Sequence, residues 1–159
     1  IEGQVLQIFA DAYTPVVDSS AIPTGEIASV EGTPMDFRTE KQIGQDIRAD
    51  FEQLHFTGGY DHNYVLGRPG EKKIMANAYC RESGIALEAE TDCCGVQFYA
   101  GNFIGEQTGK GGASYHDRSA FCLESQFYPN AVNEPDFPSP VVKAGDTYHT
   151  ETSYRFYLR

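Results

Sequence analysis

The sequence contains no tryptophan, only two methionines and few basic residues, and it has no long apolar run. No segment approaches the roughly 18 consecutive apolar residues that a membrane-spanning helix needs, so we expect none. Twelve basic residues stand against 23 acidic residues, which gives a net charge of −11. Because nucleic acids and anionic membranes bind clustered lysine and arginine, this balance argues against both as partners.

Cysteine is also scarce, and its spacing excludes the common metal sites. Cys80, Cys93, Cys94 and Cys122 form no C-x-x-C motif, and no paired histidines accompany them. The adjacent pair could form a strained vicinal disulfide, but buried free thiols also serve as small apolar groups. We favour free thiols, no metal, and a reducing compartment such as the cytoplasm.

What the chain does contain is typical of a single globular domain over residues 1–159. Apolar residues make up 40% of the sequence and aromatic residues 13%, which is enough for a packed core. Many short strand-like segments separated by turns predict an all-β fold, an antiparallel β-sandwich. The expected strands are 4–9, 26–30, 60–66, 72–81, 85–91, 96–100, 121–127 and 147–158.

Two local features make specific predictions. Ile43, Ile47, Phe51 and Leu54 fall near helical spacing and predict a helix over residues 43–54. Ser83-Gly84 lies between two strand-like segments and predicts a hairpin with a two-residue turn.

Glu124 is a carboxylate within Phe121–Phe127, a segment that otherwise reads as a buried strand. Strand alternation places Glu124 and Gln126 on one face and Leu123 on the other. Burial of such a carboxylate favours its protonated form, the property that a general base or acid near neutral pH needs. Two interpretations are open here: an ordinary solvent-facing residue, or a catalytic group.

Two further segments combine polar and aromatic residues, 58–64 around Asp61 and 95–103 around Gln97. Carboxylates and amides bind hydroxyl groups, and aromatic rings stack on sugar C–H faces, so the three segments suit a neutral sugar. Asp61 could instead tie down its own loop. The four histidines have no metal-ligand spacing and are interpreted as packed or solvated: His55, His62, His116 and His149.

Taken together, these segments resemble the C-terminal half of the aldose 1-epimerase (galactose mutarotase) family. The resemblance covers essentially the whole chain and rests on linked motifs in order. They are IPTGEI at 22–27, VEGTPMDFR at 30–38, GYDHNY at 59–64, GVQFYAGNF at 95–103 and FCLESQ at 121–126.

The resemblance implies a galactose mutarotase-like β-sandwich, of which this chain is about the C-terminal half. It implies interconversion of the α and β anomers of aldohexoses, galactose or glucose, by acid–base opening and closure of the sugar ring. In that family the FCLE glutamate is the catalytic base, which corresponds to Glu124. The motif aspartate and glutamine correspond to Asp61 and Gln97, which are expected to contact the sugar. No metal or organic cofactor is expected.

The family's catalytic acid is a histidine from the N-terminal half, and none of the four histidines here lies in the corresponding motif. We therefore expect the chain to be one piece of a cleaved or incompletely described enzyme, held against its N-terminal portion. The alternative is a β-sandwich that binds carbohydrate without catalysis.

Overall fold

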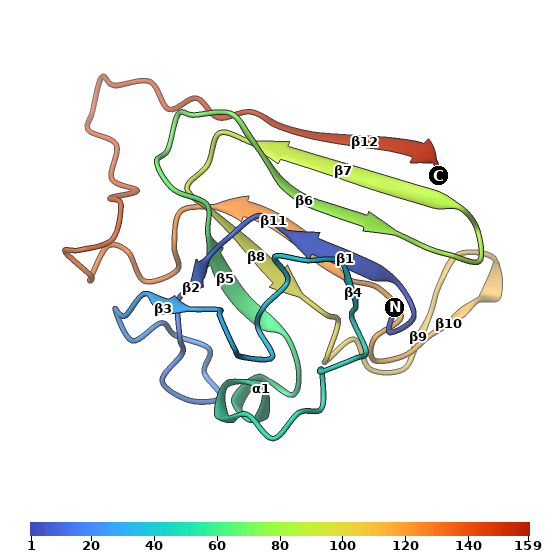
Figure 1. Ribbon diagram of the computed structural model, residues 1–159. Coiled ribbons are helices and arrows are strands. Elements are labelled where there is room, and N and C mark those ends of the chain that lie inside the picture. The colour runs from blue at the N-terminus through green and yellow to red at the C-terminus, as the bar shows by residue number, and fades with distance from the viewer.

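The computed structural model describes residues 1–159 as two five-stranded antiparallel sheets (Figure 1). Across the first sheet lie β12 (Thr152–Leu158), β7 (Ile85–Thr91), β6 (Lys73–Tyr79), β1 (Val5–Ile8) and β4 (Lys41–Gln42). Across the second lie β11 (Cys122–Gln126), β8 (Gly95–Tyr99), β5 (Asp61–Val65), β2 (Ala12–Tyr13) and β3 (Ala28–Ser29). A small hairpin and one short helix complete the fold: β9 (Gln107–Thr108), a 3-10 turn (Lys110–Gly112), β10 (Ser114–Tyr115) and α1 (Glu52–Thr57).

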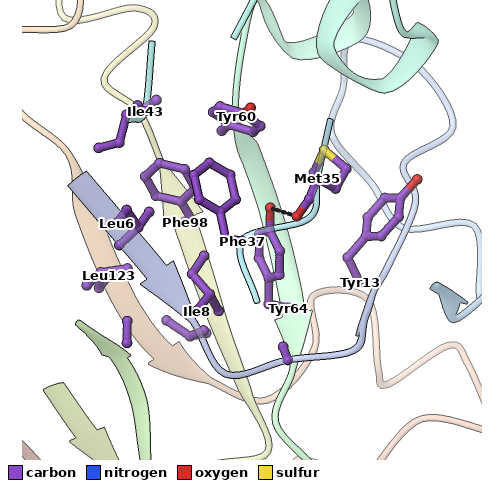
Figure 2. Close-up of a cluster of buried hydrophobic side chains, with 14 of the residues drawn as sticks. Leu6, Ile8, Tyr13, Met35, Phe37, Ile43, Tyr60, Tyr64, Phe98 and Leu123 are labelled. Carbon is purple, nitrogen blue, oxygen red and sulfur yellow. Dashed lines mark hydrogen bonds between the residues drawn. The ribbon is translucent and has the colours of Figure 1, made fainter. Parts of the chain in front are cut away.

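The core lies between the two sheets, which confirms the predicted antiparallel β-sandwich. Leu6 and Ile8 from β1 pack in one buried cluster with Phe98 from β8 and Leu123 from β11 (Figure 2). The aromatic rings meet edge to face or stacked, with the Tyr60 and Phe98 centroids 5.3 Å apart. Inward and outward residues alternate along the strands, as the period-two patterns in the sequence predict.

The helix expected at residues 43–54 is wrong. Successive turns occupy most of this segment, and only the six residues of α1 are helical. The backbone N–H of Ile43 donates to Gln4, and that of Gly44 donates to Glu2, at 2.9 and 2.8 Å. The buried isoleucines therefore reach the core through contacts with the distant N-terminal segment, which local periodicity cannot reveal. Helix α1 has six residues, and no helix of the structure is long and apolar enough to cross a membrane.

The hairpin of β6 and β7 is confirmed, but its predicted two-residue turn is wrong. Tyr79 pairs with Ala86, and the Cys80 N–H donates to the Ile85 carbonyl at 2.9 Å. Five residues, 80–84, therefore lie between the two strands. Gly84 closes this loop with a positive φ of 69°, which glycine adopts without a side-chain clash.

Strand β12 is shorter than the predicted 147–158 and lies at the edge of its sheet. It pairs only with β7, from Thr152↔Thr91 to Leu158↔Ile85. Two of its side chains also reach the other sheet. Tyr154 donates its hydroxyl to the Leu123 carbonyl at 2.8 Å, and the Thr152 hydroxyl lies 2.6 Å from that of Ser125.

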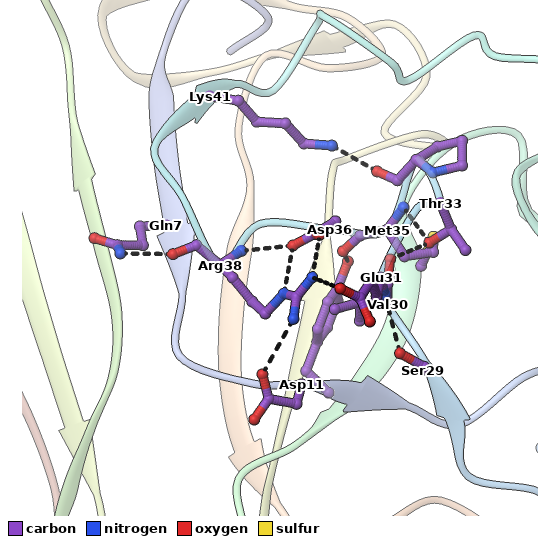
Figure 3. A network of polar contacts seen from close by, with 12 residues as sticks. Gln7, Asp11, Ser29, Val30, Glu31, Thr33, Met35, Asp36, Arg38 and Lys41 are labelled. Atoms are coloured by element: carbon purple, nitrogen blue, oxygen red, sulfur yellow. Dashed lines mark hydrogen bonds and ion pairs between the residues drawn. The ribbon is translucent and has the colours of Figure 1, made fainter.

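An arginine-centred network orders the connection between β3 and β4, which carries the VEGTPMDFR motif (Figure 3). Arg38 donates two hydrogen bonds to the Asp36 carboxylate, at 2.7 and 3.0 Å, and lies 3.6 Å from Asp11. Met35 and Phe37, from the same segment, are buried in the core. The charged side chains thus hold this connection while its apolar side chains fill the sandwich.

Candidate active site

Three neighbouring strands of the second sheet, β5, β8 and β11, present their outward faces as a grid of side chains. In one row of the register lie Asn63, Gln97 and Glu124. The adjoining row contains Asp61, Tyr99 and Cys122. The row on the other side contains Val65, Gly95 and Gln126. Segments separated by up to 60 residues in the sequence therefore meet on one surface.

An open cavity of about 370 Å³ lies over this grid. The residues that line it are Asp61, Gln97, Tyr99, Glu124, Gln126 and Pro129. All three residues predicted from the sequence to form the site therefore line a single cavity: Asp61, Gln97 and Glu124.

Glu124 points outward on β11, while its neighbour Leu123 points into the core and is only 7% exposed. The predicted division of faces on this strand is thus confirmed. Of the two interpretations left open for Glu124, the structure bears out the solvent-facing position, because Glu124 is an exposed residue. Strand β11 is an edge strand, and the outward face of its sheet is uncovered at this point.

Asp61 is half-buried at the start of β5. Its Oδ1 accepts a hydrogen bond from Gln97 Nε2 at 2.7 Å, so this carboxylate binds a neighbouring strand rather than its own loop. Burial raises the pKa of Asp61, and the hydrogen bond from Gln97 opposes that rise. Asp61 is thus a carboxylate that the fold holds in place despite the cost of its charge.

Cys122 shares the outward face of β11 with Glu124 and is a free thiol. Burial raises the pKa of this thiol, and the negative charge of the neighbouring Glu124 carboxylate raises it further. The protonated thiol is therefore a hydrogen-bond donor beside Glu124. All four cysteines are free, as predicted.

The sequence did not single out Asn63 or Gln126 as members of the site. Gln126 Nε2 donates to Gln97 Oε1 at 3.2 Å and to Asn63 Oδ1 at 3.3 Å. Period-two alternation was the available signal, since it places Asn63 on the face of Asp61 and Gln126 on the face of Glu124.

Other residues of the same motifs support the strands instead of lining the cavity. Asn102 Nδ2 donates to the carbonyls of Thr57 and Tyr60, at 3.0 and 3.1 Å, and so ties the end of β8 to the start of β5. A Cβ at Gly59 would collide with the Asn102 side chain, so this position requires glycine. These contacts hold Asp61 beside β8.

No histidine lines the cavity. His62 is fully buried on the opposite face of β5, where it packs edge-on against Tyr13. Its Nδ1 accepts the backbone N–H of Asp61 at 3.2 Å, and burial lowers its pKa to about 4. The other histidines are exposed, so all four are packed or solvated as predicted: His55, His116 and His149. No group of three His, Cys, Asp or Glu side chains has the arrangement of a metal site.

The chemistry of the cavity follows from this lining. Two carboxylates, two primary amides and a phenol offer several hydrogen-bond acceptors and donors on one open surface. Such a surface suits a small, neutral, polyhydroxylated ligand. Glu124, as the exposed carboxylate, is available to take a proton from that ligand.

Several known proteins are similar to this chain over nearly its whole length. A galactose mutarotase from Bos taurus is 45% identical over 94% of this chain, and one from Homo sapiens is 42% identical over 98%. An aldose 1-epimerase from Escherichia coli (strain K12) is 36% identical over 98%. The chain spans 42%, 44% and 45% of the lengths of these three relatives, which is less than half of each.

Solved structures show the same fold. The GalM/aldose epimerase homologue from C. elegans superimposes with a TM-score of 0.85 at 28% sequence identity. That match covers 99% of this chain and 46% of the homologue. The galactose 1-epimerase from Lactobacillus acidophilus gives a TM-score of 0.69 at 22% identity, covering 99% of this chain and 44% of that structure, which shows a shared fold. The model of the aldose 1-epimerase family matches residues 1–155, and the chain therefore belongs to that family.

Proposed function

We propose that this protein takes part in aldose 1-epimerase catalysis, interconverting the α and β anomers of aldohexoses such as galactose and glucose. One observation carries the proposal. Glu124, Asp61 and Gln97 come from three motifs far apart in the sequence, yet they line one open polar cavity. Relatives that bear the names galactose mutarotase and aldose 1-epimerase match nearly the whole chain.

In the proposed reaction Glu124 acts as the general base. Its carboxylate removes the proton from the C1 hydroxyl as the bond between C1 and the ring oxygen breaks, and an acid protonates that oxygen. The open-chain aldehyde rotates about the C1–C2 bond. Reclosure returns both protons and gives the other anomer, so the reaction consumes nothing. A well-placed base contributes roughly 10²–10⁴ in rate.

Asp61 and Gln97 bind the sugar in this proposal. Asp61 Oδ1 accepts from Gln97 Nε2, which leaves Oδ2 for a sugar hydroxyl. The second N–H of Gln97 Nε2 remains a donor for a neighbouring sugar oxygen. Asp61 and Gln97 thus offer a hydrogen-bond acceptor and a donor side by side, an arrangement that can bind two adjacent hydroxyl groups.

The acid is proposed to be a histidine from the part of the family's length that this chain does not span. The partner is accordingly the N-terminal portion of the same enzyme, beside which the chain completes one sandwich domain. An apolar groove of about 250 Å³ supports such a contact, since Leu87, Phe121 and Phe156 help to line it. Intact-mass spectrometry of the natural protein tests this idea, and a lone, folded and active 17.6 kDa species would contradict it.

The catalytic proposal is tested by complementation. The chain is co-expressed with the portion of a galactose mutarotase that it does not span, and polarimetry follows fresh α-D-galactose. We expect the complex to accelerate mutarotation and the chain alone to match buffer. Glu124→Gln should reduce turnover at least 100-fold with little change in sugar affinity, because the amide keeps the shape but not the base. The matched control Glu71→Gln, at an exposed loop position, should remain active.

Retained turnover in Glu124→Gln would remove Glu124 as the base. The second candidate function is a carbohydrate-binding sandwich without catalysis, which is favoured by the lack of any histidine in the cavity. Sugar binding by the complemented complex with mutarotation no faster than buffer would support that candidate.

We also infer a cytoplasmic location from the four free thiols. The net charge of −11 supports the further prediction that neither nucleic acid nor a membrane is a partner.

A further inference from the structure

The side chain of Gln126 reaches across a neighbouring strand because that strand offers no side chain opposite it. Gln126 pairs in register with Gly95 of β8, and Gly95 pairs with Val65 of β5. A Cβ at Gly95 would collide with Asn63 Oδ1 and would come within 3.0 Å of the Tyr128 ring. The space above this glycine is therefore what lets Gln126 contact both Gln97 and Asn63.

The contacts of Gln126 fix which way the Gln97 amide faces. Gln126 Nε2 donates to Gln97 Oε1 at 3.2 Å, so the other end of that amide, Nε2, faces the Asp61 carboxylate at 2.7 Å. Reversal of the Gln97 amide would set its N–H groups against those of Gln126 and its oxygen against the carboxylate. Both contacts would then be repulsive, so only one orientation is stable.

The Asn63 amide also faces the donor on Gln126. Asn63 Oδ1 accepts from Gln126 Nε2 at 3.3 Å, while Asn63 Nδ2 is buried without a partner. A buried unpaired donor costs roughly 1–3 kcal/mol. Reversal of the Asn63 amide would not relieve that cost, because it would bring two donors together at Gln126.

We propose that Gln126 is a positioning residue for Asp61, acting through Gln97, whose amide it orients so that an N–H is always directed at the Asp61 carboxylate. The effect on Asp61 is independent of any reaction, whereas its consequence for sugar binding rests on the proposed function. The hydrogen bonds are donated in one direction: Gln126 donates to Gln97, and Gln97 donates to Asp61. This direction keeps Asp61 an acceptor for a sugar hydroxyl, although burial favours its protonated form.

Titration of Asp61 by carboxyl NMR tests the proposal directly. We expect Gln126→Met, which removes the donor but keeps the length, to shift the pKa of Asp61 upward because Gln97 is then free to reverse. Gln97→Met should shift it upward at least as far. The double variant should titrate like Gln97→Met, because Gln126 acts only through Gln97. Gln45→Met, at an exposed position away from the site, should leave Asp61 unchanged.

The other groups that titrate beside Asp61 are the same in all these variants. They are Glu124 and Cys122 on β11, Tyr99 on β8, and His62 behind it on β5. An Asp61 pKa that does not move in Gln126→Met overturns the proposal. The proposal is also overturned if Gln126→Met shifts the Asp61 pKa equally in the wild type and in the Gln97→Met variant. Gln126 would then act on Asp61 without Gln97.

A second measurement separates this inference from the proposed function. In the complemented complex, Gln126→Met should weaken galactose binding about tenfold, as expected for one misdirected hydrogen bond. If the wild-type complex binds no sugar, the proposed function fails, while the titration still decides the role of Gln126. If the titration shows no coupling, the role of Gln126 fails whatever the complex binds.

Discussion

Asp61 carries a charge at a position where the fold makes that charge costly. It is half-buried, and burial raises its pKa, against the hydrogen bond that Gln97 donates. A folded-state pKa above the unfolded value means that this group favours folding at low pH and that the benefit is lost as the pH rises through the folded pKa. At neutral pH the ionised Asp61 therefore lowers stability.

We accordingly expect Asp61→Asn to raise the free energy of unfolding at pH 7, because Asn removes the charge and keeps an oxygen for Gln97. The same change should weaken sugar binding about tenfold or more, because hydrogen bonds to a charged acceptor are the stronger ones. Urea unfolding at pH 7 and at pH 3 measures the first effect. The gain should vanish at pH 3, where wild-type Asp61 is protonated, and a gain of equal size at both pH values would contradict the explanation.

His62 makes an opposite pH prediction from inside the core. Burial lowers its pKa from an ordinary 6.5 to about 4, so the folded protein keeps it neutral while the unfolded chain protonates it. The contribution of neutral His62 to the free energy of unfolding is present above pH 6.5 and is lost as the pH falls toward 4. The difference of about 2.5 pKa units corresponds to roughly 3 kcal/mol.

His62→Gln should therefore flatten the fall in unfolding free energy between pH 7 and pH 4, even though the substitution lowers stability overall. His149→Gln, at an exposed histidine, should leave the fall unchanged. Denaturant titrations at several pH values give the slopes. If His62→Gln loses as much stability as the wild type over this range, another group is responsible for the acid sensitivity.

Among the elements, β8 is the central strand of the site, because it lies between β5 and β11. Its alternation was readable from the sequence: Val96 and Phe98 enter the core, while Gln97 and Tyr99 face the cavity. Its first residue, Gly95, leaves room for Asn63 and for the Tyr128 ring.

Gly95→Ala should lower stability by roughly 1–3 kcal/mol, because the added methyl group overfills a packed site. It should also displace Gln126, which crosses above this position. Gly3→Ala is the matched control, since nothing lies within 4 Å of a Cβ there. If the two variants are equally stable in urea unfolding, a methyl group at position 95 does not collide with Asn63 and Tyr128, and the explanation is wrong.

The elements also show where local pattern fails. Ile43 and Ile47 have helical spacing and are buried, but the backbone N–H groups of Ile43 and Gly44 donate to Gln4 and Glu2, about 40 residues away. Strands 60–66, 85–91 and 96–100 were predictable because their alternation reflects a sheet with one face in the core. The helix was not, because long-range hydrogen bonds decided the backbone of that segment.

At the scale of the whole molecule, the sandwich has open edges. Phe156 and Leu158 on β12 are 70% and 81% exposed, and β12 pairs on one side only. Exposed apolar edge strands promote association between chains. We expect the chain without its proposed partner to self-associate as its concentration rises.

The double variant Phe156→Lys/Leu158→Lys should reduce this association and change stability by less than about 0.5 kcal/mol, because both side chains are already largely exposed. Thr147→Lys is an exposed control outside the strand. Sedimentation velocity at several concentrations measures the effect. Self-association that is equal in all three proteins would place the contact on another surface.

The β-sandwich class, the alternation that puts Glu124 and Gln126 on one face, and the motifs that mark Asp61 and Gln97 were all predictable from the amino-acid sequence. Those features depend on short segments of sequence, since a few consecutive residues are enough to show a strand's alternation and a motif. The exposure of Glu124 was not predictable in this way, nor were the hydrogen bonds that Gln126 donates to Gln97 and Asn63 above Gly95. Burial and hydrogen-bond direction depend on which strands lie side by side, and the pairing of β5, β8 and β11 joins residues that the sequence keeps far apart.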